Sequence, residues 1–308
     1  MTLAILAGCL LLYAGAEALV RGGAGLAARA GVSPLVVGLT VVAYGTSMPE
    51  LVVSITAGTG GHGDVAVGNV IGSNIFNIAV ILGLSALIRP IAVHVNVVRR
   101  DVLLMLVATL LALALMVDGR VGRVEGIVLF AGAVTYTTLA FVWGRRESSE
   151  LDGVAQERTG GVVTALALVL GGLVALVVGS RLFTSGAIEL AQRLGVGEAV
   201  IGLTIVSAGT SLPELATSAV AAMRRQADIA VGNIVGSNIF NLLCILGAAA
   251  TVAPLQAAGI RALDLAAVTV VSILILPLMR TGYRLSRWEG ALLLALYAGY
   301  LIARWPSK

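Results

Sequence analysis

Apolar runs of bilayer length dominate this chain and restrict it to a membrane fold. Of its 308 residues, 58% are hydrophobic and only 12% are charged, which is too few charges to cover a water-soluble surface. A β-barrel would instead show ten-residue segments of alternating hydrophobicity, and the sequence lacks them. The sequence predicts an all-α polytopic membrane protein of ten transmembrane helices. The ten runs fall at residues 3–28, 34–58, 64–88, 101–117, 124–144, 161–191, 197–222, 229–252, 262–279 and 288–304.

The chain also contains an internal duplication with a shift of 164 residues. "GVSPLVVGLTVVAYGTSMPELVVSITAG" (31–58) matches "GVGEAVIGLTIVSAGTSLPELATSAVAA" (195–222) at 15 of 28 positions. "DVAVGNVIGSNIFNIAVILG" (64–83) matches "DIAVGNIVGSNIFNLLCILG" (228–247) at 14 of 20. The matches include Gly, Thr, Ser, Pro, Glu and Asn, whereas chance similarity between apolar helices would align Leu, Val and Ala. We interpret the two blocks as copies of one structural unit.

The polar connection at residues 144–160 divides the ten spans into two sets of five. Because five is odd, the second set enters the membrane from the opposite side, so the repeats are predicted to be inverted. We therefore expect a first five-helix repeat at 1–144, a cytoplasmic linker loop at 145–160 and a second, inverted repeat at 161–308. Placing the N-terminus outside puts about twice as many basic residues in cytoplasmic as in outer connections, which favours both termini outside a cell (inner) membrane.

The first duplicated motif, GTSMPEL or GTSLPEL, places a carboxylate near mid-bilayer in each half, at Glu50 and Glu214. An ionised carboxylate at that depth costs at least a few kcal/mol and persists where it faces a cavity and meets a cation or a proton. The basic residues within spans are Arg21 and Arg181, both nearer the helix ends. Two symmetric carboxylates without a basic partner at their depth favour a cation site over a buried ion pair.

Proline and hydroxyl residues surround both carboxylates. Pro49 and Pro213 each remove a helical hydrogen bond, so we expect backbone carbonyls near Ala43–Gly45 and Ser207–Gly209 to become available as oxygen ligands. Hydroxyl oxygens lie within one turn of the carboxylates, on Thr46, Ser47, Thr210 and Ser211. A proline kink alone would explain one such segment, but it does not explain two copies that each carry a Glu.

The second motif, GNVIGSNIFN or GNIVGSNIFN, carries a polar stripe on one helix face. Its members are spaced by four residues: Asn69, Ser73 and Asn77 in the first copy, and Asn233, Ser237 and Asn241 in the second. Asn74 and Asn238 fall off this stripe, and we expect them to form hydrogen bonds between helices. The glycines of the motif also match a helix-packing pattern, so packing and cation binding are compatible roles here.

These motifs together offer carboxylate, hydroxyl, amide and carbonyl oxygens. Hard oxygen ligands suit Ca²⁺ or Na⁺ rather than Zn²⁺ or Cu⁺. One Ca²⁺ neutralises the charge of two carboxylates in a low-dielectric setting, and two Na⁺ or two H⁺ would do the same. Mutually exclusive binding of Ca²⁺ and monovalent ions is the basis of an antiporter. No cofactor is expected, and Ca²⁺ and Na⁺ (or H⁺) would be the transported ions.

All four motif copies resemble the α-repeats of the cation/Ca²⁺ exchanger superfamily, in particular its prokaryotic sodium/calcium exchanger-like branch. The resemblance implies ten helices in two inverted halves, a central cluster of four cation sites, and alternating access by sliding of the first and sixth helices. It also implies that the ions are ligated by Glu50, Glu214, Thr46, Ser47, Thr210, Ser211, Ser73, Ser237, Asn77 and the position of Asn241, with backbone carbonyls from Ala43 and Ser207.

The chain departs from the family pattern at Asn241, where sodium/calcium exchangers of this kind usually have Asp. The site then has two carboxylates instead of three, which leaves the coupling ion open. Ca²⁺/Na⁺ antiport is the main hypothesis, and an H⁺/Ca²⁺ or K⁺-involving exchanger on the same fold is the alternative. An ion channel would not need a duplicated acidic site, and an intramembrane hydrolase would need a nucleophile–base pair, which Ser47 and Ser211 lack in sequence.

The expected partners of this protein are the transported ions and the lipid bilayer, without nucleic acid. The protein is expected not to be an enzyme and to function as a monomer. The net charge of +4 fits loops that face anionic lipid. Glu17, in the first predicted span, is either a gate contact between helices or an interfacial charge.

Overall fold

The computed structural model describes residues 2–150, 161–195, 205 and 207–304. Within these residues the chain is helical apart from short loops and four two-residue strands. Six described helices are long and apolar enough to cross a membrane, or seven if the bent pair Pro34–Thr46 and Met48–Thr59 counts as one span. Nine of the ten predicted segments lie on described helices, and the predicted segment 197–222 falls partly outside the described residues.

The first half of the chain contains the following elements, with π-helical turns denoted η. They are α1 (Thr2–Ala30), α2 (Pro34–Val37), η1 (Gly38–Val42), α3 (Ala43–Thr46), α4 (Met48–Thr59), α5 (Gly63–Phe76), η2 (Asn77–Leu82), α6 (Gly83–Ile88), β1 (Ile91–Ala92), η3 (Val97–Asp101), α7 (Val102–Leu115), β2 (Arg120–Val121) and α8 (Arg123–Glu150). Helix α8 therefore continues through residues 145–150 of the predicted linker, and residues 151–160 lie outside the described part.

The described part of the second half follows this order, except that no π-helical turn precedes its helix α15. Its elements are α9 (Val162–Arg193), α11 (Ser207–Thr210), α12 (Leu212–Met223), α13 (Ala227–Phe240), η5 (Asn241–Ile245), α14 (Leu246–Val252), β3 (Leu255–Gln256), α15 (Ala262–Arg280), β4 (Arg284–Leu285) and α16 (Arg287–Arg304).

The chain divides into two compact units that do not follow the two repeats. Unit 1 comprises Met1–Pro49 and Ala140–Asn233, and unit 2 comprises Glu50–Leu139 and Ile234–Lys308. Each unit therefore draws on both repeats, and the boundaries fall inside α4, α8 and α13.

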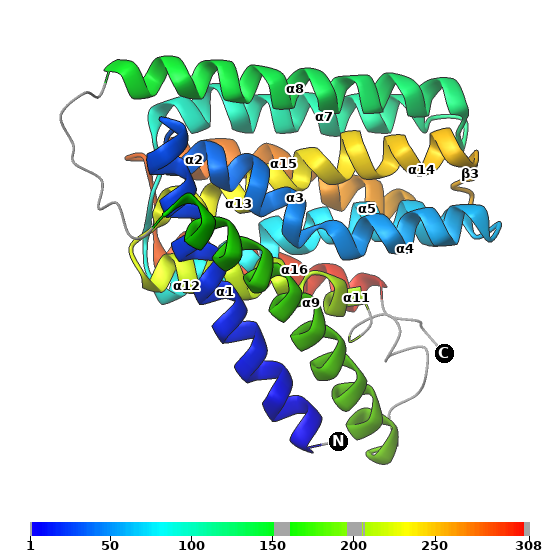
Figure 1. Cartoon of the computed structure of the whole chain (residues 1–308). Coiled ribbons are helices and arrows are strands. Elements are labelled where there is room, and N and C mark those ends of the chain that lie inside the picture. The colour runs from blue at the N-terminus through cyan, green and yellow to red at the C-terminus, as the bar shows by residue number, and fades with distance from the viewer. Residues whose placement is uncertain (1, 151–160, 196–204, 206, 305–308) are drawn as a thin grey trace. The chain divides into compact units, whose positions relative to one another are not determined.

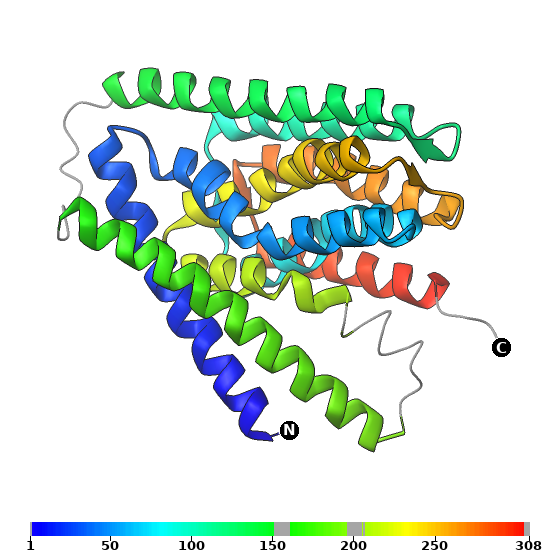
Figure 2. The ribbon, with the colours of Figure 1, turned by 45° about the vertical axis from the view of Figure 1, so that its right-hand side comes forward.

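Unit 1 is built around the pair α1 and α9, which run side by side in opposite directions (Figures 1 and 2). Small residues at intervals of seven form the contact: a Cβ added at Gly8 would lie 2.9 Å from the Gly179 carbonyl oxygen, and one at Gly15 would lie 2.8 Å from that of Gly172. Such backbone approach suits a bilayer, where tight packing replaces water exclusion as the force between helices. The shift of 164 maps the pair Gly8 and Gly179 onto Gly172 and Gly15, as inverted repeats require.

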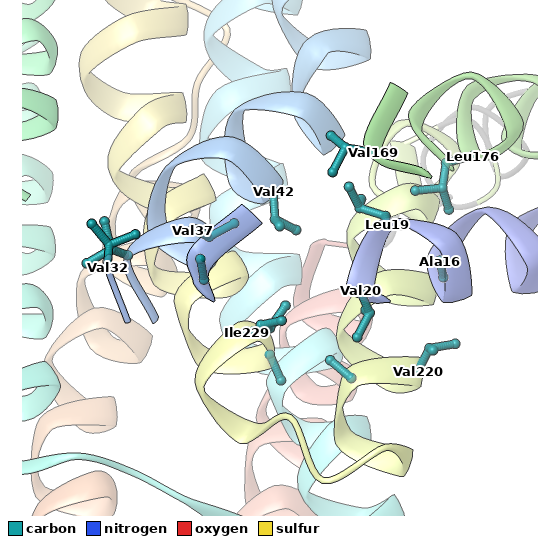
Figure 3. Close-up of a cluster of buried hydrophobic side chains, with 14 of the residues drawn as sticks. Ala16, Leu19, Val20, Val32, Val37, Val42, Val169, Leu176, Val220 and Ile229 are labelled. Atoms are coloured by element: carbon teal, nitrogen blue, oxygen red, sulfur yellow. The ribbon is translucent and has the colours of Figure 1, made fainter. Parts of the chain in front are cut away.

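An apolar cluster completes unit 1. Side chains from α1, α9, the segment from Val32 to Val42, α12 and α13 meet there (Figure 3). Ala16, Leu19 and Leu176 are fully buried in it. This cluster packs the C-terminal part of α12 and the N-terminal part of α13 in unit 1. It thereby helps to position the motif residues Glu214 and Asn233 on these two helices.

Unit 2 shows the same symmetry in its strands and glycines. β1 pairs with β4 through Ile91 and Leu285, and β3 pairs with β2 through Leu255 and Val121. The shift of 164 maps the first ladder onto the second. It also maps the reciprocal glycine contact between α6 and α16 onto the one between α14 and α8; the two pairs are Gly83 with Gly290 and Gly247 with Gly126. The duplication in sequence is therefore a duplication in structure.

Candidate functional site

The first motif forms a kink in the predicted second span. α3 and α4 meet at Ser47 with a bend of 46° between the helices on either side. The expectation that this kink frees the Ala43 carbonyl is wrong, because the Ser47 backbone N–H donates to it at 3.1 Å. The Thr46 hydroxyl also lies 3.2 Å from the same oxygen. The Ala43 carbonyl thus accepts hydrogen bonds from its own helix, and its ligation of a cation stays a prediction.

The equivalent kink in the second repeat is closed in a different way. Pro213 removes the helical donor to the Gly209 carbonyl, and the Ser180 hydroxyl on α9 donates to that oxygen at 2.6 Å. α9 approaches both kinks closely: a Cβ at Gly45 would lie 2.6 Å from Leu173, and a Cβ at Gly209 would lie 2.6 Å from Thr184. Ala16 occupies the position equivalent to Ser180 in the first repeat, so this hydroxyl contact has no counterpart at the Gly45 carbonyl although the sequence motifs are alike.

Unit 1 brings together motif residues from both repeats. The Ser47 hydroxyl donates to Oε1 of Glu214 at 2.7 Å. Both side chains are buried, with Glu214 only 1% exposed. Oε2 of Glu214 accepts no hydrogen bond from any described residue. Among the described residues no Arg or Lys pairs with this carboxylate, so its charge calls for a cation or a proton.

Asn233 fixes the backbone beneath Glu214. Its Nδ2 donates to the Glu214 carbonyl at 3.3 Å and to the Ser218 hydroxyl at 2.9 Å. Its Oδ1 accepts from the Thr46 hydroxyl at 3.1 Å. The Thr46 hydroxyl has one proton and three acceptors within reach, namely Asn233 Oδ1 and the Val42 and Ala43 carbonyls of its own helix. Its oxygen can therefore act as an acceptor while its proton stays on the protein.

Unit 2 contains the equivalent pair of Asn hydrogen bonds around Glu50, which is 1% exposed. Asn69 Nδ2 donates to the Glu50 carbonyl at 3.2 Å and to the Ser54 hydroxyl at 2.9 Å. These distances match those at Asn233 and are related by the same shift of 164. The backbone carbonyl of each Glu is therefore held by an Asn from the following helix of its own repeat.

Four buried Asn of unit 2 form a second cluster. Asn77 Nδ2 donates to Asn238 Oδ1 at 3.3 Å, and Asn241 Nδ2 donates to Asn74 Oδ1 at 3.0 Å. Asn74 Nδ2 in turn donates to the Asn238 backbone carbonyl at 3.2 Å. The prediction that Asn74 and Asn238 bond between helices is confirmed. Asn77 and Asn241 are also the first residues of the π-helical turns η2 and η5, a local geometry that recurs at functional sites.

The remaining predicted ligands are placed on the same helices. Ser73, Ser211 and Ser237 are at most 4% exposed, and Thr210 is half-buried at the end of α11. Ser207 begins α11, and its side chain lies outside the described residues. The described residues contain no group of three or more His, Cys, Asp or Glu that could hold a metal ion, so any ligand shell must draw on hydroxyl, amide and backbone oxygens.

The sequence predicts Asn69 and Asn233 as members of the polar stripe but does not predict their hydrogen bonds to the Glu backbones. The contact of Ser180 has no signal in the sequence, because the equivalent position in the first repeat is Ala16.

Comparisons with known proteins bear on the family and the fold of this chain. A family model described as "Sodium/calcium exchanger protein" matches residues 1–142 and 164–305. The putative antiporter CaxA of Alkalimonas amylolytica is 38% identical over 311 residues, which cover 97% of each chain. The inner membrane protein YrbG of Escherichia coli is 39% identical over 260 residues, which cover 82% of this chain and 80% of that protein.

Solved structures match over nearly the whole chain. One of the sodium-calcium exchanger NCX_Mj, soaked with 2.5 mM Na⁺ and 0.1 mM Ca²⁺, has a TM-score of 0.85 and 34% sequence identity, and the match covers 99% of this chain and 98% of that one. This match confirms the predicted all-α fold of ten transmembrane helices in two inverted repeats.

Proposed function

The chain belongs to the sodium/calcium exchanger protein family, and we propose that it exchanges Ca²⁺ for Na⁺ as a secondary antiporter. It is a multi-pass membrane cation exchanger and not an enzyme.

One observation carries the proposal. Glu214 is buried, receives one hydroxyl proton from Ser47 and leaves its second carboxylate oxygen without a donor among the described residues. A buried carboxylate in that state is stable only with a compensating positive charge. The Ser47 hydroxyl donates its proton in a hydrogen bond to Glu214, so its oxygen lies 2.7 Å from the carboxylate that would bind the cation. A carboxylate with an adjoining hydroxyl oxygen is ligand chemistry for Ca²⁺ and Na⁺.

Charge balance supplies the coupling. Glu50 and Glu214 bring two negative charges, which one Ca²⁺ or two Na⁺ would neutralise. The two kinds of ion then compete for the same oxygens. A change of conformation without a bound ion is unfavourable, because it leaves two uncompensated negative charges in a low-dielectric site. We assign the ligand shell to the two Glu, to the hydroxyls of Thr46, Ser47, Thr210, Ser211, Ser73 and Ser237, to the amides of Asn77 and Asn241, and to the carbonyls of Ala43 and Ser207.

The transport cycle is proposed to move the α1 and α9 pair, which packs through glycine backbones and whose helix α9 contacts both kinks in unit 1. Alternating access of this kind exposes a fixed site to each side of the membrane in turn. We further propose a monomer in the cell (inner) membrane with both termini outside and the 145–160 connection in the cytoplasm. YrbG, named an inner membrane protein, supports the location.

The test is ⁴⁵Ca²⁺ uptake into proteoliposomes with an outward Na⁺ gradient. Glu214→Gln and Glu50→Gln are each expected to reduce uptake about a hundredfold or more, because contacts to an ionised group are worth up to a few kcal/mol each and the charge balance is lost. Glu189→Gln is the matched control, since Glu189 is exposed and paired with Arg193 near the end of α9. Wild-type uptake by a folded Glu50/Glu214 double variant would refute the proposal.

A second candidate coupling ion follows from the amide at position 241. Because Asn241 cannot hold a charge or release a proton, the site has only two titratable groups, and two H⁺ balance one Ca²⁺ as well as two Na⁺ do. Imposing Na⁺, K⁺ and pH gradients one at a time separates the cases. Uptake driven by a pH gradient in the absence of Na⁺ would replace Na⁺ by H⁺ as the coupling ion.

A further inference from the structure

We infer that Asn74 and Asn238 are positioning residues, each of which holds the ligand Asn of the other repeat so that its amide oxygen faces a cation. Asn74 would orient Asn241, and Asn238 would orient Asn77. The inference rests on the proposed function, because it concerns how two of the proposed ligands are aimed. All four side chains lie in unit 2 and are at most 1% exposed.

The orientation begins at a backbone carbonyl, which can only accept hydrogen bonds. Asn74 Nδ2 donates to the Asn238 carbonyl oxygen at 3.2 Å. That bond determines which end of the Asn74 amide is nitrogen. The oxygen end, Oδ1, must therefore lie on the other side, where it offers an acceptor to the neighbouring helix.

Asn241 then has only one favourable orientation. Its partner atom is Asn74 Oδ1, so it presents Nδ2 and donates at 3.0 Å. Turning the Asn241 amide round would set two acceptor oxygens against each other in a buried setting. The Asn241 oxygen consequently points away from Asn74, and it accepts no hydrogen bond from any described residue. A buried acceptor in this state is costly unless a donor or a cation reaches it.

The pair Asn238 and Asn77 is equivalent to the pair Asn74 and Asn241 under the shift of 164, but its amides are held by a different contact. Asn77 Nδ2 donates to Asn238 Oδ1 at 3.3 Å, and Asn77 Oδ1 likewise has no donor among the described residues. The Asn238 amide is held by donation to the Met105 sulfur at 3.5 Å. A thioether is a weak acceptor, so the orientation of the Asn77 amide is fixed less firmly than that of the Asn241 amide.

The arrangement also explains why this chain has an amide at position 241. Asn74 Oδ1 needs a donor from residue 241, and an ionised carboxylate there has none to give. Accepting a carboxylate would require the Asn74 amide to turn round, which breaks its bond to the Asn238 carbonyl. The cluster therefore selects a neutral amide at position 241 and keeps the site at two carboxylates.

Double-mutant cycles on equilibrium ⁴⁵Ca²⁺ binding to purified protein, without any Na⁺ gradient, test the inference. The single variants are Asn74→Ala, Asn77→Ala, Asn238→Ala and Asn241→Ala. Four double variants combine them: two between the repeats (Asn74 with Asn241, Asn77 with Asn238) and two within one repeat (Asn74 with Asn77, Asn238 with Asn241). We expect each single variant to weaken binding roughly fivefold to tenfold, as one lost hydrogen bond predicts. The pairs Asn74 with Asn241 and Asn238 with Asn77 should be non-additive by about fivefold.

The discriminating result is the crossed pattern. The same-helix pairs, Asn74 with Asn77 and Asn238 with Asn241, should be additive, and coupling in those pairs or in none would overturn the inference. Thr109→Ala is the matched control: Thr109 is fully buried on α7 in the same unit, and its hydroxyl donates to the Met105 carbonyl of its own helix at 2.9 Å, so binding should not change. If an alanine variant is not monodisperse, the serine variant, whose hydroxyl is too short to reach the partner amide, replaces it in the same cycle.

The two proposals fail in distinguishable ways. Wild-type protein that binds no ⁴⁵Ca²⁺ would overturn the proposed function and this inference with it. Wild-type binding without crossed coupling would overturn the inference alone, and crossed coupling in a protein that is driven by H⁺ instead of Na⁺ would support it.

Discussion

Replacing Gly172 by alanine tests the backbone contact between α1 and α9. A Cβ there would lie 2.7 Å from the Gly15 carbonyl oxygen and 2.8 Å from the Leu19 backbone nitrogen. Ordinary van der Waals separations are about 3.5 Å or more, so the helices would have to part by roughly 0.7 Å. Neither obstacle is a flexible side chain, and overpacking of this kind costs about 1–3 kcal/mol.

The neighbouring glycine provides a matched control. Gly171 is exposed on the same helix, and a Cβ there would meet nothing within 4 Å. Both substitutions change helix propensity by the same amount, about 1 kcal/mol in aqueous helices, so that contribution cancels in the comparison. The difference between the two variants is therefore the packing cost alone, about 1–3 kcal/mol.

Thermal unfolding of detergent-solubilised protein measures this difference. Gly171→Ala should unfold at or slightly above the wild-type temperature, and Gly172→Ala should unfold several degrees below Gly171→Ala. Transport by Gly172→Ala should fall as well if α1 and α9 move as one pair. Equal melting temperatures for the two variants would refute the close approach of the helices.

Three further predictions concern the Asn residues that bond the Glu backbones, the ion pair of Arg224, and the glycine packing next to β3. Asn233→Ala should weaken ⁴⁵Ca²⁺ binding more than Asn69→Ala, because Asn233 also accepts from Thr46 and each hydrogen bond is worth about 1 kcal/mol; an equal loss would contradict this. Arg224→Gln should lower stability by less than about 1 kcal/mol, since Glu17 keeps Arg21 as a partner, and the loss should shrink as NaCl is raised during thermal unfolding; a loss that is independent of salt would argue against an ionic role. Gly63→Ala should destabilise the protein, because its Cβ would lie 2.6 Å from the Gln256 carbonyl oxygen, whereas Gly68→Ala, with 3.7 Å to Ile260, should not; similar melting temperatures would place Gly63 away from β3.

The helical segments and the inverted symmetry could be predicted from the sequence, because both depend on patterns along the chain. Hydropathy runs of bilayer length predict spans, and an odd number of spans in a duplicated half predicts inversion. The same duplication identified Glu50 and Glu214, since a carboxylate placed twice within apolar runs has few structural explanations. It also separated Asn74 and Asn238 from the polar stripe by helical periodicity alone, and the structure confirms that they bond between helices.

Only the tertiary structure decided which of these residues meet. Ser47 reaches Glu214 and Asn241 reaches Asn74 across 167 residues of chain in each case, and helical periodicity does not determine how two helices cross or rotate against each other. The closure of the Gly209 carbonyl by Ser180 breaks the repeat symmetry, so no copy of the motif could predict it. The division into units that cut across both repeats likewise follows from packing between distant helices, a property that the order of residues along the chain does not display.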